Sequence, residues 1–175
     1  MYLVPAIGLV FIGINKVASN SLGRAIHAAH SGVEAFPRSQ HAEHSELKVA
    51  MWREPHERIE SAFRMFRPET SFSKFVIRFS EAEAIWDKHL RPQTDFCSWQ
   101  GRRFVDHVIQ WDFYEFARIF ATDPIEHRNP SEPMAIFWSA EARKAFDSRF
   151  AEDIEIWNKP PTAGKIMSGQ VTQNV

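Results

Sequence analysis

The sequence is poor in the features that mark several common classes of protein. It holds one cysteine, Cys97, in 175 residues, which excludes an internal disulfide and a zinc site built from cysteines. It has no surplus of either charge, because 21 lysine and arginine residues face 22 aspartate and glutamate residues. General nucleic-acid and membrane-surface binders normally carry a basic excess, so we expect neither partner. An anionic ligand must then be bound by a local cluster of cationic side chains.

No apolar run in the sequence is long enough to cross a membrane. The longest one near the N-terminus, residues 7–14, has the length of a strand and contains two glycines. It also lacks the charged leader and the cleavage site of a signal peptide. We therefore expect a cytoplasmic protein without a membrane span. The length and the 44% hydrophobic content predict one globular domain over residues 1–157, followed by a C-terminal tail over residues 158–175.

Strand-like and helix-like segments alternate along the chain. Short apolar runs predict strands, which lie at residues 7–14, 33–36, 47–52 and 104–109. Apolar residues at helical spacing predict helices, which lie at residues 22–29, 55–66, 113–120 and 140–157, with one or two more within residues 72–86. This alternation predicts a three-layer α/β fold, in which a mostly parallel central sheet is flanked by helices.

The first candidate site is the turn that follows the strand at residues 7–14. Lys16 lies in this turn, and the Ser-Asn-Ser stretch at residues 19–21 offers N-cap side chains to the next helix. Free N–H groups at a helix start favour an anion, and a lysine adds a mobile cation. The Walker A pattern is absent, and the next strand ends in Arg53 instead of a magnesium-binding aspartate, which disfavours metal-dependent phosphoryl transfer. The alternative is a surface lysine beside a capped helix.

The second candidate site begins where the strand at residues 47–52 passes into a helix. Arg53 lies at the carboxyl end of this strand, the edge where open α/β sheets bind ligands. An arginine there can bind a phosphate through its two-pronged guanidinium, and Ser61, two turns on, can add a hydroxyl. The alternative is a structural arginine, paired with Glu54 or Glu57, and a serine at a helix interface.

Together the two sites resemble the donor-binding motifs of sulfotransferases. Residues 14–22, Ile-Asn-Lys-Val-Ala-Ser-Asn-Ser-Leu, are similar to the loop that binds the 5′-phosphosulfate in that family. Residues 49–63, which contain Trp-Arg-Glu-Pro-His-Glu-Arg-Ile-Glu-Ser, are similar to its 3′-phosphate motif. Asn15 stands where the family has proline, Asn20 where it has threonine and Glu54 where it has aspartate.

Three later stretches extend the resemblance to the carbohydrate sulfotransferases. Residues 87–97 are similar to their His-Trp-x-Pro-Gln…Cys region, and residues 108–112 to their Val-Gly-(Lys/Arg)-(Tyr/Phe)-Glu segment. Residues 150–157 resemble their closing helix. The motifs span about residues 9–157 in the family's order. The chain therefore resembles the Golgi-type (family 2) carbohydrate sulfotransferases, in a short form.

The resemblance implies a P-loop-NTPase-like sulfotransferase fold and a reaction. These enzymes transfer a sulfuryl group, without a metal ion, from 3′-phosphoadenosine 5′-phosphosulfate (PAPS) to a hydroxyl, here of a carbohydrate or a glycosylated metabolite. By position, Lys16 would contact the 5′-phosphosulfate and stabilise the leaving phosphate, and Arg53 and Ser61 would hold the 3′-phosphate. The donor-binding residues that the resemblance implies are Lys16, Val17, Ala18, Ser19, Asn20, Ser21, Arg53 and Ser61.

The reaction also needs a base that takes the proton of the acceptor hydroxyl, and a histidine, with its usual pKa of about 6.5, suits this role. Related sulfotransferases often place the base between the first helix and the strand that leads to Arg53, where this chain has His30, His41 and His44. We predict His41 as the base, then His44, with His89 of the third motif as the rival. The spacing of His41 and His44 could also suit a metal ion, but the sequence offers no third ligand, and we expect no metal.

Two other interpretations of the same residues stay open. A nucleotide-binding phosphotransferase of the kinase type would use the same strand, loop and helix, and it would bind ATP with magnesium. A non-catalytic module could retain the site for PAPS, or for its desulfated product PAP, without acceptor chemistry. If the protein is an enzyme, its partner is a small-molecule or glycan acceptor, which we expect to contact loops at residues 66–73 and 123–133.

Overall fold

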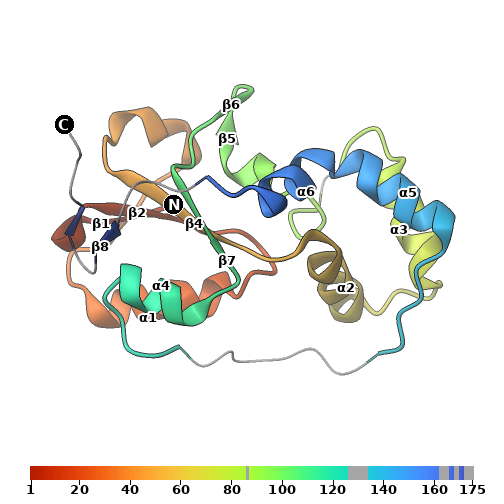
Figure 1. Ribbon diagram of the computed structural model, residues 1–175, viewed down its shortest axis with the longest axis horizontal. Helices are drawn as coiled ribbons and strands as arrows, with labels where there is room; N and C mark the ends of the chain where they lie inside the picture. The colour runs from red at the N-terminus through yellow and green to blue at the C-terminus, as the bar shows by residue number, and fades with distance from the viewer. Residues whose placement is uncertain (86, 126–133, 162–165, 168–169, 172–175) are drawn as a thin grey trace.

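The computed structural model describes residues 1–85, 87–125, 134–161, 166–167 and 170–171. Its main sheet has five strands in the order β3-β1-β2-β4-β7 (Figure 1). These strands are β1 (Tyr2–Val4), β2 (Leu9–Ile12), β3 (Glu34–Ala35), β4 (Leu47–Trp52) and β7 (His107–Gln110). β2, β4 and β7 are parallel neighbours, and β1 runs antiparallel to both β2 and β3. The predicted mixed α/β fold with a mostly parallel sheet is confirmed.

The described helices connect and flank these strands. They are α1 (Ser19–Ala29), α2 (Pro55–Phe66), α3 (Phe72–Ser80), α4 (Phe113–Ile119), α5 (Ala140–Arg149) and α6 (Ala151–Asn158). Short 3-10 turns lie at η1 (Pro5–Ile7), η2 (Arg38–Glu43) and η3 (Thr94–Phe96). Two small hairpins complete the described elements: β5 (Ser98–Trp99) with β6 (Arg102–Arg103), and β8 (Ile166–Met167) with β9 (Gln170–Val171).

Alternate residues of the central strands face opposite sides of the sheet, and both sides are covered. On one side Phe11 and Val49 pack with buried side chains of α1 and α4, which lie next to each other along the sheet (Figure 1). On the other side Ala50 and Val108 pack in a cluster that includes Ile156 of α6. The sheet is therefore a middle layer, and its carboxyl edge stays open to the loops that carry the candidate sites.

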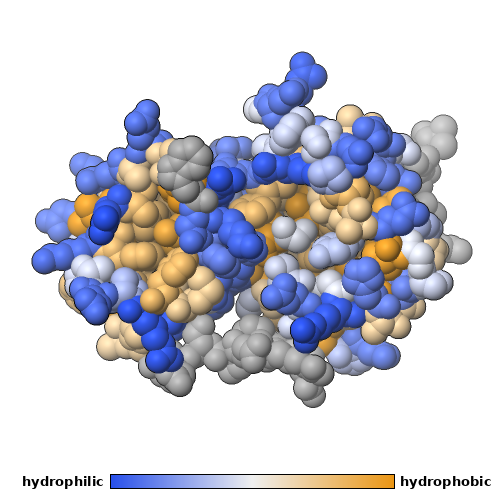
Figure 2. All heavy atoms as spheres, turned by 180° about the vertical axis from the view of Figure 1, so that it is seen from behind, coloured by the Kyte–Doolittle hydropathy of each residue, from blue (hydrophilic) through white to orange (hydrophobic). Residues whose placement is uncertain are grey.

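A further hydrophobic cluster lies among α2, α3 and α5, beyond the carboxyl ends of the parallel strands (Figure 1). Aromatic pairs fill it: Phe146 stacks on Phe150 at 4.3 Å, and Phe63 meets Phe72 edge-on at 5.1 Å. Figure 2 shows that apolar side chains also reach the surface on this half of the molecule. The cluster forms a wall beside the end of β4, from which α2 starts.

Several predicted elements are shorter than the sequence pattern indicated. The strand expected at residues 7–14 is limited to Leu9–Ile12, because the chain turns through η1 on leaving β1. Gly8 closes this turn with φ of 62°, a conformation that glycine adopts without strain. The strand expected at residues 104–109 begins only at His107.

The helix expected at residues 140–157 is in fact two helices, α5 and α6, which meet at Phe150. Phe150 has φ of −109° and ψ of 24°, which is outside the helical region, and its ring is 1% exposed. The break lets this ring enter the aromatic cluster while α6 turns toward the sheet. In the segment at residues 72–86, where one or two helices are expected, α3 ends at Ser80, and Trp86 lies outside the described residues.

Two predicted segments are described only in part. The C-terminal tail at residues 158–175 and the acceptor loop at residues 123–133 lie in large part outside the described residues. Among the described helices, none has the length and apolar character that crossing a membrane requires.

Candidate functional site

The loop at residues 13–18 connects β2 to α1 and carries Lys16. Lys16 and Ala18 both have left-handed backbone, with φ of 67° and 55°. Such a conformation costs about 1–3 kcal/mol at a residue other than glycine, and it persists only where the surroundings enforce it. Val17, between the two, is fully buried and anchors the loop to the core. The loop is therefore a tightly held structure rather than a loose connection.

The start of α1 differs from the predicted side-chain N-cap. Ala18 precedes the first turn, and no side chain caps the helix. The carbonyl of Ala18 accepts hydrogen bonds from the N–H groups of Ser21 and Leu22, at 2.8 and 3.1 Å. The N–H groups of Ser19 and Asn20 have no acceptor within the helix, since the first turn of a helix lacks one. The loop and helix start therefore present N–H groups that can bind an anion.

Three cationic side chains converge beside this loop. Lys16 follows β2, Arg53 follows β4, and Arg58 lies near the start of α2. β2 and β4 are parallel and paired at Ile12 and Ala50, so their carboxyl ends share one edge of the sheet. Burial lowers the pKa of Lys16, and the charges of Arg53 and Arg58 lower it further. The structure thus brings the two predicted sites together into one concentration of positive charge.

Arg53 is held at this edge through its backbone. Its N–H donates to Gln93 Oε1 at 3.1 Å, and its carbonyl accepts from Gln93 Nε2 at 2.9 Å. Its guanidinium lies 4.8 Å from the centre of the Trp111 ring, and its Nε is 3.5 Å from Glu57 Oε2. Burial lowers the pKa of Arg53. The Glu57 side chain is 58% exposed, so this pair is weak and leaves the guanidinium able to bind a ligand.

Gln93 is itself fixed by a buried carboxylate. Its N–H donates to Asp153 Oδ2 at 2.6 Å, and the N–H and hydroxyl of Thr94 donate to Asp153 Oδ1 at 2.9 and 3.0 Å. Burial raises the pKa of Asp153. Sequence reasoning gave Gln93 and Asp153 no role of their own. A signal was present, because Asp153 lies at helical spacing from the apolar Phe150 and Ile156, and an acid on an apolar face needs a buried partner.

α2 adds two more buried polar side chains, Arg58 and Ser61, which are 1% and 6% exposed. Arg58 Nε donates to the carbonyl of Asn15 at 3.0 Å, and its Nη2 has no hydrogen-bond partner within the described structure. Burial lowers the pKa of Arg58 to about 10, although the negative charges of Asp153 and Asp95 act to raise it. Ser61 lies on the helix that Arg53 precedes, as its motif predicts. Arg58 belongs to the motif at residues 49–63, but the sequence analysis gave it no role, and its burial beside Asn15 makes it a further functional candidate.

The predicted bases His41 and His44 lie on and after η2, packed against aromatic rings. His41 stacks on Phe104 at 4.4 Å, and its Nδ1 donates to a backbone carbonyl within η2 at 3.1 Å. The ring of His44 lies 4.0 Å from Phe36, and its Nδ1 is 3.6 Å from Glu46 Oε2. The two rings contact different residues, and no cluster of three or more potential metal ligands occurs in the described part of the chain.

His89 has a different environment, beside the loop at residues 13–18. Its Nδ1 donates to Asp87 Oδ1 at 2.9 Å, and its ring meets the ring of Phe66 edge-on at 5.9 Å. Asn15 Nδ2 donates to the carbonyl of Lys88 at 3.3 Å, and this bond joins the segment of His89 to the residue before Lys16.

Two hollows open near these residues. A cavity of about 410 Å³ is lined by Asn15, Ser19 and Asn20 on the loop side and by Phe36 and Pro37 on the other. A second groove, of about 480 Å³, lies beneath the β5–β6 hairpin, and its lining includes Arg38, Arg91, Thr94, Trp99 and Arg103. Pro37, which lines the first hollow, and Arg38, which lines the second, are consecutive residues at the start of η2.

No family model, curated protein or solved structure matches the chain. The protein is a mixed α/β protein with a five-stranded, mostly parallel sheet, and its cationic site lies at the carboxyl edge of the parallel strands.

Proposed function

We propose that the protein is a PAPS-dependent sulfotransferase with a P-loop-NTPase-like fold, which acts on a hydroxyl of a carbohydrate or a glycosylated metabolite. The observation that carries this proposal is the convergence of Lys16, Arg53 and Arg58 at neighbouring strand ends. Three neighbouring cations repel one another, so a ligand with several negative charges stabilises them. PAPS carries such charges at two separate places, a 5′-phosphosulfate and a 3′-phosphate.

The two phosphate-bearing ends of PAPS fit the two halves of the site. The 5′-phosphosulfate binds Lys16 and the N–H groups from Val17 to Asn20, because a helix start favours an anion. The N–H of Ser21, which the resemblance included, instead donates to the carbonyl of Ala18. The 3′-phosphate binds Arg53, which directly follows β4, and Ser61, which lies two turns into α2. A 3′-phosphate distinguishes PAPS from ATP, so Arg53 sets the donor preference.

In the reaction the acceptor oxygen attacks sulfur while the bond between sulfur and the 5′-phosphate oxygen breaks. PAP leaves with the electrons of that bond, and the acceptor proton passes to a base. Lys16 stabilises the negative charge that grows on the leaving phosphate oxygen, which makes its contribution largest in the transition state.

The sequence-based order of bases, His41, then His44, then His89, stays a prediction. The geometry favours His89, because Asp87 orients its ring and its segment is bonded to Asn15. Replacing each histidine by alanine tests the order, since the base should contribute roughly 10²–10⁴ in rate without changing PAP affinity. Unchanged transfer rates in all three variants would remove histidine as the base.

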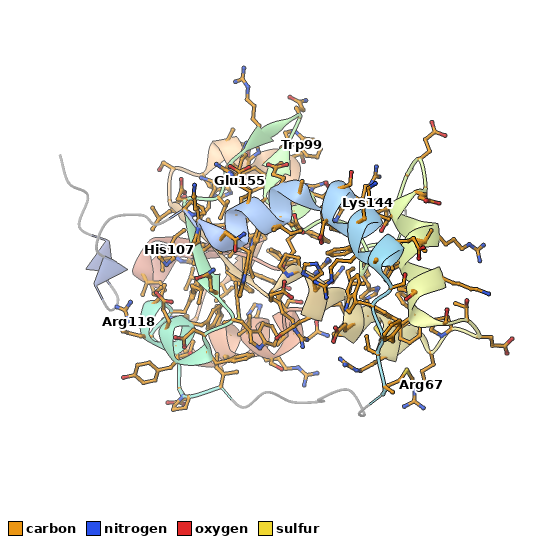
Figure 3. The ribbon with its side chains drawn as sticks, turned by 45° about the vertical axis from the view of Figure 1, so that its right-hand side comes forward. Arg67, Trp99, His107, Arg118, Lys144 and Glu155 are labelled. Atoms are coloured by element: carbon orange, nitrogen blue, oxygen red, sulfur yellow. The ribbon has the colours of Figure 1, made fainter. Side chains whose placement is uncertain are left out.

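We propose that the acceptor binds in the groove beside the β5–β6 hairpin. The lining of this groove includes none of the described residues of the loops at 66–73 and 123–133, so this placement differs from the sequence-based expectation. Arg38 lies over the Trp99 ring at 5.5 Å, and Arg91 and Arg103 line the same groove, so aromatic surface and hydrogen-bond donors stand together as sugar binding requires. Figure 3 shows Trp99 at the hairpin, apart from β7 and α4. Thr94 lines the groove and follows Gln93, which bonds Arg53, so acceptor and donor sites adjoin.

Nucleotide-binding calorimetry separates the proposed sulfotransferase from the competing phosphotransferase. Calorimetry should show PAP binding without metal and no comparable binding of ATP with magnesium. The reverse result would reject the sulfotransferase. Transfer of radiolabelled sulfate from PAPS to a panel of glycans then separates an enzyme from a module that only binds the nucleotide.

A further inference from the structure

Arg58 is the most deeply buried cation of the site, and its contacts join α2 to the loop that carries Lys16. It is 1% exposed, and its Nε donates to the carbonyl of Asn15 at 3.0 Å. Asn15 lies 43 positions away in sequence, so this bond is a tertiary contact between two elements of the site. A buried guanidinium with Nη2 left unpartnered in the described structure costs stability, and such a cost is expected where a residue serves a function.

The bond fixes the direction of the peptide unit between Asn15 and Lys16. In a planar trans peptide the carbonyl and the N–H point in opposite directions. Because Arg58 holds the Asn15 carbonyl on its own side, the N–H of Lys16 points away from Arg58. The same bond supports the left-handed backbone of Lys16, whose φ is 67°.

We propose that Arg58 is a positioning residue, which holds the loop at residues 13–18 so that the Lys16 N–H and side chain receive the 5′-phosphate end of the nucleotide. This inference rests on the proposed function. It assigns the two arginines of one motif to opposite ends of the ligand: Arg53 binds the 3′-phosphate directly, and Arg58 acts on the 5′-phosphate through the loop. The division follows from geometry, since Arg58 bonds the loop backbone while Arg53 is held by Gln93.

Three nucleotides separate the two ends of the site: PAP, adenosine 5′-monophosphate and adenosine 3′-monophosphate. By calorimetry, Arg58→Met should weaken PAP and the 5′-monophosphate about tenfold or more, the loss of one charge-assisted hydrogen bond, and leave the 3′-monophosphate within twofold. Arg53→Ala should weaken PAP and the 3′-monophosphate by a similar factor and leave the 5′-monophosphate within twofold. Arg58→Lys retains a charged donor and should recover part of the 5′-phosphate affinity. Arg78→Met, which removes an exposed arginine of α3, should leave all three affinities unchanged.

A purely structural role predicts a different result, because a loosened core would weaken all three nucleotides alike. That outcome, or unchanged affinities in Arg58→Met, would overturn the proposal. If Arg58→Met does not fold, Arg58→Lys carries the same comparison, and loss of folding in both variants would assign Arg58 to the core and overturn it too. Wild-type protein that binds none of the three nucleotides would instead reject the proposed function itself.

Discussion

His56 links the start of α2 to α5 through two carboxylates, and its charge can be tested directly. Its Nδ1 lies 2.7 Å from Glu54 Oε1 and its Nε2 lies 2.7 Å from Asp147 Oδ1. A neutral imidazole has one N–H, so only the imidazolium can donate to both. Burial alone would lower the pKa of His56, but the hydrogen bonds and charges of Glu54 and Asp147 outweigh it and raise the pKa above its usual value. The rings of Trp138 and Phe146, at 5.1 and 4.9 Å, complete its surroundings.

The sign of the pH dependence follows from the raised pKa. The contribution of His56 to the free energy of unfolding is fully present below about pH 6.5, the usual pKa in an unfolded chain, and it is lost as the pH rises through the folded value. A hydrogen bond to a charged group contributes about 1.5–3 kcal/mol. The Asp147 side chain is 45% exposed, which reduces its share to about 1 kcal/mol or less, while that of Glu54 is 29% exposed. We therefore expect His56→Ala to cost about 2–3 kcal/mol at pH 5.5 and about half as much at pH 9.

Urea unfolding of wild type and His56→Ala at the two pH values measures this difference, with His27→Ala, an exposed position of α1, as the control. Nitrogen-15 spectra of the imidazole report in parallel whether both ring nitrogens carry protons at pH 6. Equal losses of unfolding free energy at pH 5.5 and pH 9, or a His56 ring that titrates below pH 6.5, would refute the reasoning.

Three further predictions concern the proposed activity. Lys16→Ala should lower the rate of sulfuryl transfer by roughly 10²–10³ and weaken PAP binding far less, because the lysine charge matters most in the transition state. Single-turnover rates and calorimetry measure the two effects, and equal losses of rate and of PAP affinity would contradict the prediction. Arg53→Ala should weaken PAP by about tenfold or more and leave adenosine 5′-phosphosulfate, which lacks the 3′-phosphate, nearly unchanged. Equal weakening of both nucleotides would make Arg53 structural. Arg103→Ala should raise the acceptor KM with PAP affinity intact, whereas its neighbour Arg102, which is exposed and does not line the groove, should tolerate alanine. A similar acceptor KM in the two variants would place the acceptor elsewhere.

Local pattern was enough to predict the parallel core of the fold. Apolar runs such as residues 47–52 become buried strands because their hydrophobicity needs both faces of a sheet covered, and helical spacing at residues 55–66 gives α2. The juxtaposition of Lys16 and Arg53 followed from the same pattern, since parallel strands end at one edge. Strand β1 escaped prediction because three residues carry little pattern and gain their place only by pairing with β2 and β3.

Tertiary structure alone decided which polar side chains hold Arg53 at the carboxyl edge of the sheet. Gln93 bonds Arg53 across 40 positions, and Asp153 bonds Gln93 across 60. The split of residues 140–157 at Phe150 likewise depends on an aromatic cluster drawn from three helices. A buried polar group or a helix break is stabilised by partners far along the chain, and the burial that makes those bonds strong exists only once the chain has folded. The amino-acid pattern therefore determined the strands and the two motifs that meet, while folding determined how Arg53 and Lys16 are held.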